Sequence, residues 1–305
     1  MIYITGDCHG HYKRFTKKRF PTQRMMSKQD YVIVCGDFGL WDRSKKQEYY
    51  RKWLNGRNFT LLWVDGNHEN YDMLKEYEIV EWKGGKVQFI NPSIIHLMRG
   101  QIYEIDGLKI FTFGGARCHD IEGGVLELDD EHLAEKSIEL EKKGIFYRVN
   151  HQSWWAEEMP SREERDEGIH NLGKYQNEVD YIITHCAPTS IQNYFTEGNY
   201  VTDELTDYLE GLKGSIKFKK WYFGHYHDNR IFEEKFCLLY KHIELLEDKA
   251  EDSGSAGSKT EDRGNAESRL PDGIPETKTE YRRNTESKPA DGIAETKTED
   301  SRNAE

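Results

Sequence analysis

Five short apolar runs constrain this chain more than any other feature. They read MIYIT, YVIVC (31–35), FTLLWV (59–64), YIIT (181–184) and KWYF (220–223). Their β-branched and aromatic residues are typical of strands that are buried on both faces of a sheet. Because the carboxyl ends of such strands form the crevice where α/β proteins bind ligands, we expect whatever follows these runs to gather at one rim.

Polar side chains follow each run at once. They are Asp7 and His9, Asp37, Asn67 and His68, His185, and His225 and His227. Glycines at 6, 36, 66 and 224 would let the backbone turn sharply without a side-chain clash. If the chain stays extended, a spacing of two residues points Asp7 and His9 the same way, and His225 and His227 likewise, whereas adjacent residues such as Asn67 and His68 diverge.

This set of side chains predicts a metal site. Carboxylate, amide and imidazole groups without a matching thiolate suit Mn, Fe, Zn or Mg. The set is larger than one ion takes from a protein, but a bridging carboxylate would give each of two ions four protein contacts. Two divalent ions against two carboxylates leave positive charge that can hold an anion and acidify a water molecule, so a phosphate ester is the expected substrate.

The same blocks carry a family resemblance. GDCHG (6–10), GDFG (36–39), GNHE (66–69), TH (184–185) and GHYH (224–227), in that order, resemble the signature of the calcineurin-like metallophosphoesterase superfamily. The resemblance covers most of residues 1–240. It implies an α/β fold, a two-sheet αββα sandwich with a binuclear centre between loops at the strand ends.

The resemblance also implies roles for individual residues. One ion would be held by Asp7, His9, Asp37 and His227, and the other by Asp37, Asn67, His185 and His225. Asp37 would be the catalytic bridging ligand, and His68 would contact the phosphate and protonate the leaving oxygen after attack by a hydroxide held between the ions. The cofactors expected are two divalent ions, with Mn favoured over Fe, Zn, Ni or Mg.

Two further stretches resemble small bacterial or phage-type phosphoesterases of this superfamily. They are GGARCHDI (114–121) and SWWAEEMPSREE (153–164). Arg117 and His119 follow a strand and two glycines, so they are candidate substrate-binding residues, with a surface turn as the alternative. The chain departs from Ser/Thr protein phosphatases, whose second block reads GDxVDRG, because here it reads GDFGLWDR. Protein phosphatase activity is therefore in doubt, and the sequence leaves monoesters and diesters open.

The remainder of residues 1–247 fits one phosphoesterase domain. Ser44 with Gln47 predicts a helix start and Gly56 its end, and IIHLMRGQIYEIDGLKIFTFGG (94–115) predicts a meander of short strands. Residues 117–175 hold charged helices, one begun by Ser161 with Glu164 three residues on, and are expected to form a helical cap insertion. The tryptophan pair at 154–155 is expected to anchor that cap, in preference to stacking on a nucleobase.

The last part of the chain differs in composition. Residues 248–305 contain no Trp, Phe, Val, Met or Cys, and units that begin at Lys259, Lys278 and Lys297 repeat every 19 residues. Such a segment buries too little apolar surface to offset its ordering entropy, so it predicts a disordered low-complexity tail.

Charge and composition bound the partners. The net charge is −12, of which residues 248–305 supply −5 and residues 1–247 supply −7 by count of acidic and basic residues. That argues against a broadly basic nucleic-acid-binding face but leaves a local basic patch open. No signal peptide or long apolar stretch is visible, and five scattered cysteines fit a reducing compartment, so a cytoplasmic protein without membrane contact is expected. The expected partner is a phosphate ester, with nucleotides among the candidates, and the oligomeric state is left open. The alternative function is a non-catalytic metal-binding scaffold that recruits a partner through the cap or the tail.

Overall fold

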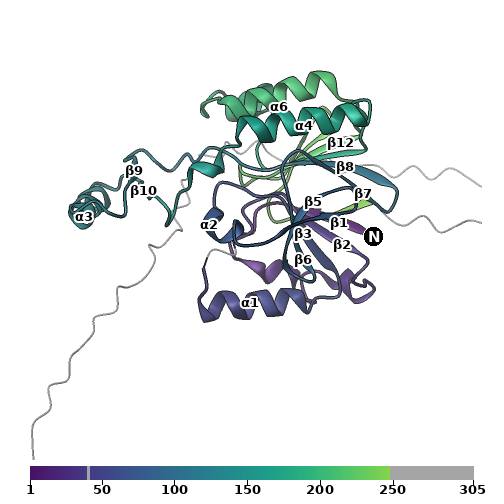
Figure 1. The fold of residues 1–305 in the computed structure, drawn as a ribbon, viewed down its shortest axis with the longest axis horizontal. Helices are drawn as coiled ribbons and strands as arrows, with labels where there is room; N and C mark the ends of the chain where they lie inside the picture. Colours follow the sequence, from purple (N-terminus) through teal and green to yellow (C-terminus); the bar gives the residue numbers. More distant parts are fainter. Residues whose placement is uncertain (40–41, 248–305) are drawn as a thin grey trace, which may run out of the picture. The chain divides into compact units, whose positions relative to one another are not determined.

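Two β-sheets stacked face to face make up the centre of the protein (Figure 1). The computed structural model describes residues 1–39 and 42–247, so the tail predicted over 248–305 lies outside the described residues. Within the described part, no helix is both long and apolar enough to cross a membrane.

The first sheet has seven strands in the order β15-β1-β2-β3-β6-β5-β4. These are β1 Ile2–Thr5, β2 Tyr31–Val34, β3 Thr60–Trp63, β4 Ile79–Trp82, β5 Gly85–Asn91, β6 Ile94–Leu97 and β15 Ile243–Glu247. Strands β1, β2, β3 and β6 are parallel. Their carboxyl ends therefore lie at the same edge of the sheet.

The second sheet has six strands in the order β13-β14-β12-β11-β8-β7. These are β7 Gln101–Ile105, β8 Leu108–Phe113, β11 Tyr181–Thr184, β12 Lys220–Phe223, β13 Arg230–Phe232 and β14 Phe236–Leu238. Strands β8, β11, β12 and β14 are parallel. All five apolar runs predicted as strands are strands, three in the first sheet and two in the second.

Helices cover both outer faces of the pair of sheets. Against the first sheet pack η1 Tyr12–Phe15, η2 Pro21–Arg24, α1 Lys45–Asn55 and α2 Tyr71–Leu74, and against the second α4 Arg162–Lys174, α5 Thr189–Thr196 and α6 Glu204–Ser215. Figure 1 shows α1 on one side and α4 with α6 on the other. This arrangement confirms the predicted two-sheet αββα sandwich.

The alternation of strand residues explains the layers. In β2, Tyr31 and Ile33 face the apolar core between the sheets, whereas Val32 and Val34 face the helices. Successive side chains of a strand point to opposite faces, and here both faces are covered, so every residue of β2 is buried. This is why the runs read as continuously apolar in sequence.

The helix ends follow the predicted capping chemistry. Ser44 accepts a hydrogen bond from the backbone N–H of Gln47 at the start of α1, and Gly56 ends that helix. Ser161 and Glu164 form a complete capping box at the start of α4. The Ser44 and Ser161 side chains each accept a backbone N–H that would otherwise have no hydrogen-bond partner within the first turn of the helix.

The predicted meander over 94–115 is wrong in one respect. β6 pairs with β3 and β5 in the first sheet, whereas β7 and β8 form a hairpin in the second. The Arg99-Gly100 turn therefore crosses from one sheet to the other. At this point the chain changes layers, which alternation of side chains alone does not reveal.

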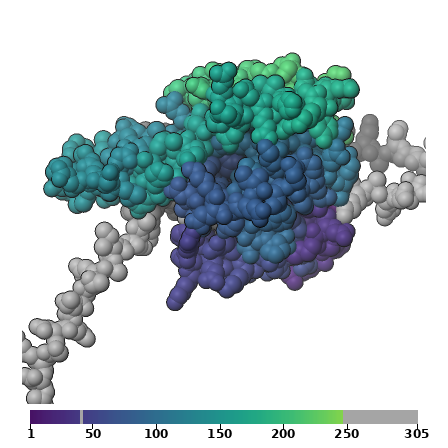
Figure 2. Space-filling model, in the orientation of Figure 1, coloured from purple at the N-terminus to yellow at the C-terminus, as the bar shows by residue number. Residues whose placement is uncertain are grey.

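Residues 117–155 include an arm that stands out from the sandwich surface (Figure 2). It contains the short parallel pair β9 Val125–Leu126 and β10 Arg148–Val149 and the helix α3 Leu133–Lys143, none of whose residues is buried. After the arm come η3 Ala156–Glu158 and α4, and α4 packs against β7 as part of the sandwich. Trp155 is buried, and its indole N–H donates to Asp72 of α2 at 2.7 Å, which ties the arm to the sandwich.

Candidate metal centre

The residues that follow β1, β2, β3, β11 and β12 converge at one place between the ends of the two sheets. Asp7 and Asp37 come from the first sheet and are buried, with 0% and 1% of their surface exposed. His185 and His227 come from the second sheet and contact those carboxylates. The site therefore spans the gap between the sheets rather than the edge of one.

Asp7, His9 and His227 form one group of potential ligands. The Nε2 atoms of His9 and His227 lie 2.9 Å apart. Asp7 Oδ2 lies 3.1 Å from His227 Nε2 and 3.6 Å from His9 Nε2. The three side chains thus direct their ligand atoms at a common point.

Asp7, Asp37 and His185 form a second group. Asp37 Oδ2 lies 3.4 Å from His185 Nε2 and also 3.5 Å from His9 Nε2, so this carboxylate stands between the two groups. Asn67 Oδ1 approaches His185 Nε2 at 3.2 Å. The other ring nitrogen of His185, Nδ1, lies 2.7 Å from the carbonyl oxygen of Cys35, which fixes the orientation of the ring.

These separations fit metal coordination. For metal–ligand bonds of about 2.1 Å, ligand atoms at octahedral or tetrahedral angles stand about 3.0–3.4 Å apart. The distances around Asp7 and Asp37 fall in or close to that range. Buried carboxylates that meet imidazoles, with no lysine or arginine side chain paired to them in the described residues, form a donor set that suits divalent cations.

The charge balance of the site points the same way. Burial of His185 lowers its pKa, but the Asp37 and Asp7 carboxylates outweigh burial and raise the pKa to about 10. Burial likewise raises the pKa of Asp37, yet the nearby histidines hold that pKa well below its usual value. A proton on His185 thus balances the carboxylates here, and a bound cation would displace this proton.

Four of the candidate ligand residues have left-handed backbone. His9, Asp37, His225 and His227 have φ of 46°, 48°, 70° and 53°. The expectation that an extended chain points His225 and His227 the same way is therefore wrong. His227 turns toward His9, while the ring of His225 lies 5.0 Å from that of His185, because each left-handed residue redirects the chain.

Two glycines are required by the close approach of the ligands. A Cβ on Gly36 would stand 2.0 Å from His185 Nδ1, and a Cβ on Gly66 would stand 2.1 Å from Asp37 Oδ1. Gly36 also has φ of 96°, which disfavours other residues. These glycines were expected only to let the chain turn, but they also leave room for the side chains of the site.

His68 lies beside His9 of the first group and beside Asp37 of the second. Its ring centroid is 5.3 Å from that of His9, and its backbone N–H donates to Asp37 Oδ1 at 2.8 Å. Burial lowers the pKa of His68 to about 4, although Asp37 opposes that effect. The imidazole is therefore neutral at neutral pH.

The two candidate substrate-binding residues differ. His119 Nε2 lies 3.1 Å from His225 Nε2, and its ring packs against Tyr200 with centroids 4.3 Å apart. Arg117 is exposed, and no hydrogen bond or ion pair joins it to the site within the described residues. His119 thus borders the site, whereas Arg117 lies on the surface of the preceding loop.

A buried ionic network that the sequence did not predict lies behind the site. Arg99 donates to Asp65 Oδ2 from Nε at 2.8 Å and from Nη2 at 2.5 Å, and His96 Nε2 lies 3.2 Å from Asp65 Oδ1. Asp65 directly precedes Gly66, and its carbonyl oxygen accepts the N–H of Gly115 after β8. An acidic residue within the apolar run WVDGN was the only signal in the sequence.

Glu69 is a second missed residue. It is 2% exposed and accepts the backbone N–H groups of Phe38 at 2.6 Å and Gly39 at 3.3 Å, directly after Asp37. Burial, with Asp37 adding to it, raises the pKa of Glu69 well above its usual value. This carboxyl group therefore fixes the loop that carries the central carboxylate.

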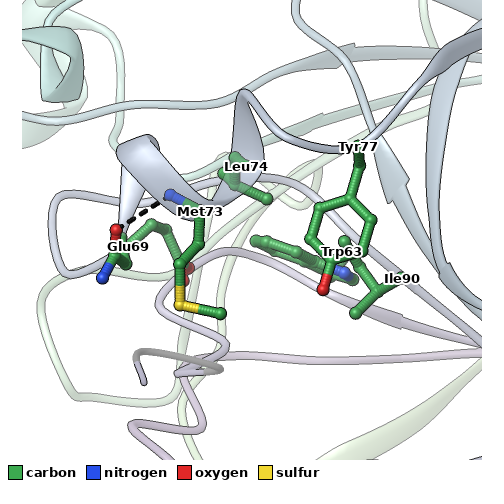
Figure 3. A pocket seen from close by; sticks show the side chains of 7 residues that line it. Trp63, Glu69, Met73, Leu74, Tyr77 and Ile90 are labelled. Carbon is green, nitrogen blue, oxygen red and sulfur yellow. Dashed lines mark hydrogen bonds between the residues drawn. The ribbon is translucent and has the colours of Figure 1, made fainter. Parts of the chain in front are cut away.

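A small cavity lies next to Glu69 (Figure 3). Its volume is about 10 Å³, which is the space of about one water molecule. Figure 3 shows Glu69 and Met73 on one side of it and Trp63 with Tyr77 and Ile90 on the other. The cavity is far too small for a substrate.

A two-sheet sandwich with this cluster at its strand ends defines the class of metal-dependent phosphoesterases. The family model described as calcineurin-like phosphoesterase matches residues 1–229, and the chain belongs to that family. No curated protein matches the chain at a significant level. Among solved structures it resembles the phosphopantetheinyl hydrolase PptH from Mycobacterium tuberculosis, with 15% identity over 78% of this chain and 87% of that chain, at a TM-score of 0.33.

Proposed function

We propose that the protein is a binuclear phosphoester hydrolase. The ligands of one ion would be Asp7, His9, Asp37 and His227, and those of the other Asp37, Asn67, His185 and His225. The observation that carries this proposal is the position of Asp37, whose Oδ2 lies 3.5 Å from His9 and 3.4 Å from His185. Such a carboxylate can bridge two cations.

Two divalent ions, when bound, would supply an activated water nucleophile and would neutralise charge on the phosphate. We favour Mn, because carboxylate, amide and imidazole ligands without thiolate suit it. The chain's own residues do the remaining work. His185 is locked by its bond to Cys35, and Glu69 holds the loop of Asp37, so the ligand atoms are oriented before substrate arrives.

His68 would act on the leaving group. Its imidazole is neutral at neutral pH, so it must gain a proton before it can serve as an acid. A bound phosphate brings negative charge close to the ring and would raise its pKa again. His68 would then donate a proton to the leaving oxygen, which contributes about 10²- to 10⁴-fold for a well-positioned acid.

The first experiment measures metal and activity together. Protein loaded with Mn should contain two equivalents of metal and should hydrolyse p-nitrophenyl phosphate or its bis-ester. Asp37→Asn should lose both properties, while Asp166→Asn on the exposed face of α4 serves as the matched control. A fully active Asp37→Asn protein in chelator-treated buffer would exclude the binuclear mechanism.

The second experiment isolates His68. His68→Ala should lower turnover by about 10²- to 10⁴-fold while two equivalents of metal remain bound. His170→Ala, an exposed histidine on α4, should match the wild type in both respects. Metal loss in His68→Ala would instead mean that the ring supports the ligands rather than the leaving group.

A further inference from the structure

A group of lysines borders one side of the metal centre. Lys13 lies in η1 after the loop of Asp7 and His9, Lys46 lies in the first turn of α1, and Lys241 follows β14. All three side chains are exposed, and none forms an ion pair within residues 1–39 and 42–247. We call Lys13, Lys46 and Lys241 the basic rim.

Contacts connect Lys241 to the metal centre. The ring of Tyr240 stacks on that of His227, with centroids 4.6 Å apart and an angle of 17° between the planes. Lys241 Nζ lies 4.7 Å from the centroid of the same Tyr240 ring. Arg14 Nη1 donates both to the carbonyl oxygen of Gly6 at 2.9 Å and to that of Tyr240 at 2.7 Å, so this segment is fixed beside the strand end that carries Asp7.

The loop after β1 brings the other two lysines to the same side. Gly10 N–H donates to the carbonyl oxygen of Phe38, and Gln47, the neighbour of Lys46, has its amide nitrogen 3.9 Å from where a Cβ on Gly10 would stand. The N-terminus of α1, which carries a partial positive charge, therefore adjoins this loop. Lys13 follows three residues after Gly10 in the chain.

His11 lies among these lysines. Lys13, Lys46 and Lys241 are all close enough to its ring to interact with it electrostatically. Residues 1–247 carry a net charge of −7 by count. The basic rim is therefore a positively charged patch on a domain whose net charge is negative.

We propose that the basic rim binds a second phosphate group of the substrate, next to the phosphate at the metal centre. Preferred substrates would then carry two or more phosphates, either in a compact polyphosphate or along a nucleic-acid strand. The Tyr240 ring is already stacked on His227 and contacted by the Nζ of Lys241. Recognition on this side therefore depends on phosphate charge rather than on base stacking. This inference rests on the proposed function, because it extends the same site.

The test uses the full-length, Mn-loaded protein and the triple variant Lys13→Gln, Lys46→Gln and Lys241→Gln. Competition binding is measured for inorganic phosphate, for tripolyphosphate and for a short oligothymidylate, and hydrolysis of bis-p-nitrophenyl phosphate is measured in parallel. The matched control is the triple variant Lys109→Gln, Lys174→Gln and Lys217→Gln. It removes the same charge, but these lysines gather near the amino ends of β8 and β12, at the opposite edge of the second sheet.

The wild type should bind tripolyphosphate more tightly than phosphate, and the rim variant should lose about tenfold of that affinity. For oligothymidylate, the slope of log affinity against log salt should become shallower by about 0.7 for each lysine that contacts a phosphate. The control variant should follow the wild type. If the rim variant loses affinity for tripolyphosphate alone, the preferred substrate is a compact polyphosphate. If it loses salt-dependent affinity for oligothymidylate, the preferred substrate is a nucleic-acid strand. Either result supports phosphate binding by the basic rim.

Other outcomes would overturn the inference. If the rim variant binds tripolyphosphate and oligothymidylate as tightly as the control variant does, the rim has no part in phosphate binding. If the wild type prefers phosphate over both ligands, the site takes no second phosphate. These results stand apart from the proposed function, since a protein with rim-dependent binding and no hydrolysis of the bis-ester would refute the hydrolase mechanism but keep the rim.

Discussion

The buried pair of Asp65 and Arg99 is expected to contribute strongly to the stability of the fold, because each side chain compensates the charge of the other. Only 2% and 5% of the two side chains are exposed, and two guanidinium nitrogens bind one carboxylate oxygen. Removing one partner of a buried pair leaves an uncompensated charge, which costs about 3–5 kcal/mol. For a domain of this size each kcal/mol corresponds to about 2–4 °C in Tm, so Asp65→Asn should lower Tm by about 6–20 °C.

A double-mutant cycle measures this coupling. Asp65→Asn, Arg99→Met and the double variant are compared by urea unfolding at pH 7. Because the double variant removes both charges, its loss of stability should be smaller than the sum of the single losses by about 2 kcal/mol or more. Additive losses, within about 0.5 kcal/mol, would refute the reasoning, since the two side chains would then act independently.

The pH dependence of the same variants provides a second check. Burial raises the pKa of Asp65, but Arg99 and His96 outweigh it and hold the pKa below its ordinary value of 3.8. A carboxyl group with a depressed folded-state pKa stabilises the protein above its unfolded pKa, and this contribution is lost as the pH falls through the folded-state pKa. The stability difference between wild type and Asp65→Asn should therefore be full at pH 7 and shrink below about pH 4.

Three further outcomes follow from the structure. Gly66→Ala should abolish metal binding in metal analysis, because its Cβ would stand 2.1 Å from Asp37 Oδ1, whereas Gly173→Ala, with nothing within 4 Å, should not. Burial raises the pKa of Glu158 to about 7, so the folded protein loses stability as the pH rises from about 4.5 to 7 and this carboxyl group becomes charged. The free energy of unfolding of Glu158→Gln, measured by thermal unfolding, should match that of the wild type at pH 5. At pH 8 it should be higher than that of the wild type by up to about 3 kcal/mol. Removal of Mn by a chelator should lower Tm, because a ligand that binds only the folded state stabilises that state. The stabilisation is about 2.7 kcal/mol when the free ligand concentration is a hundred times Kd.

The sequence was sufficient for the strands and for the order of the polar residues. Continuous apolar runs such as 31–35 predict strands that are covered on both faces. The helix caps at Ser44 and Ser161 depend only on residues within three positions along the chain. These signals are local, so the chain carries them without reference to the rest of the fold. The same is true of the prediction that polar residues follow directly after the strand ends.

Features that depend on distant neighbours were not predictable. Asp65 and Arg99 are 34 residues apart, and the sequence around either residue does not predict that the two form an ion pair. The change of sheet at Arg99-Gly100 is likewise invisible, because a strand alternates in the same way in either layer. The left-handed backbone at His9 and His227 was also missed, since non-glycine residues rarely adopt it and only the surrounding site requires it.

That backbone sets stability against metal binding. Each non-glycine residue held with positive φ costs on the order of 1 kcal/mol, and His9, Asp37, His225 and His227 all lie in this region. Glycine at any of these four positions would relieve the strain and would also remove a proposed ligand. A variant selected only for a higher Tm would therefore be expected to lose its ions.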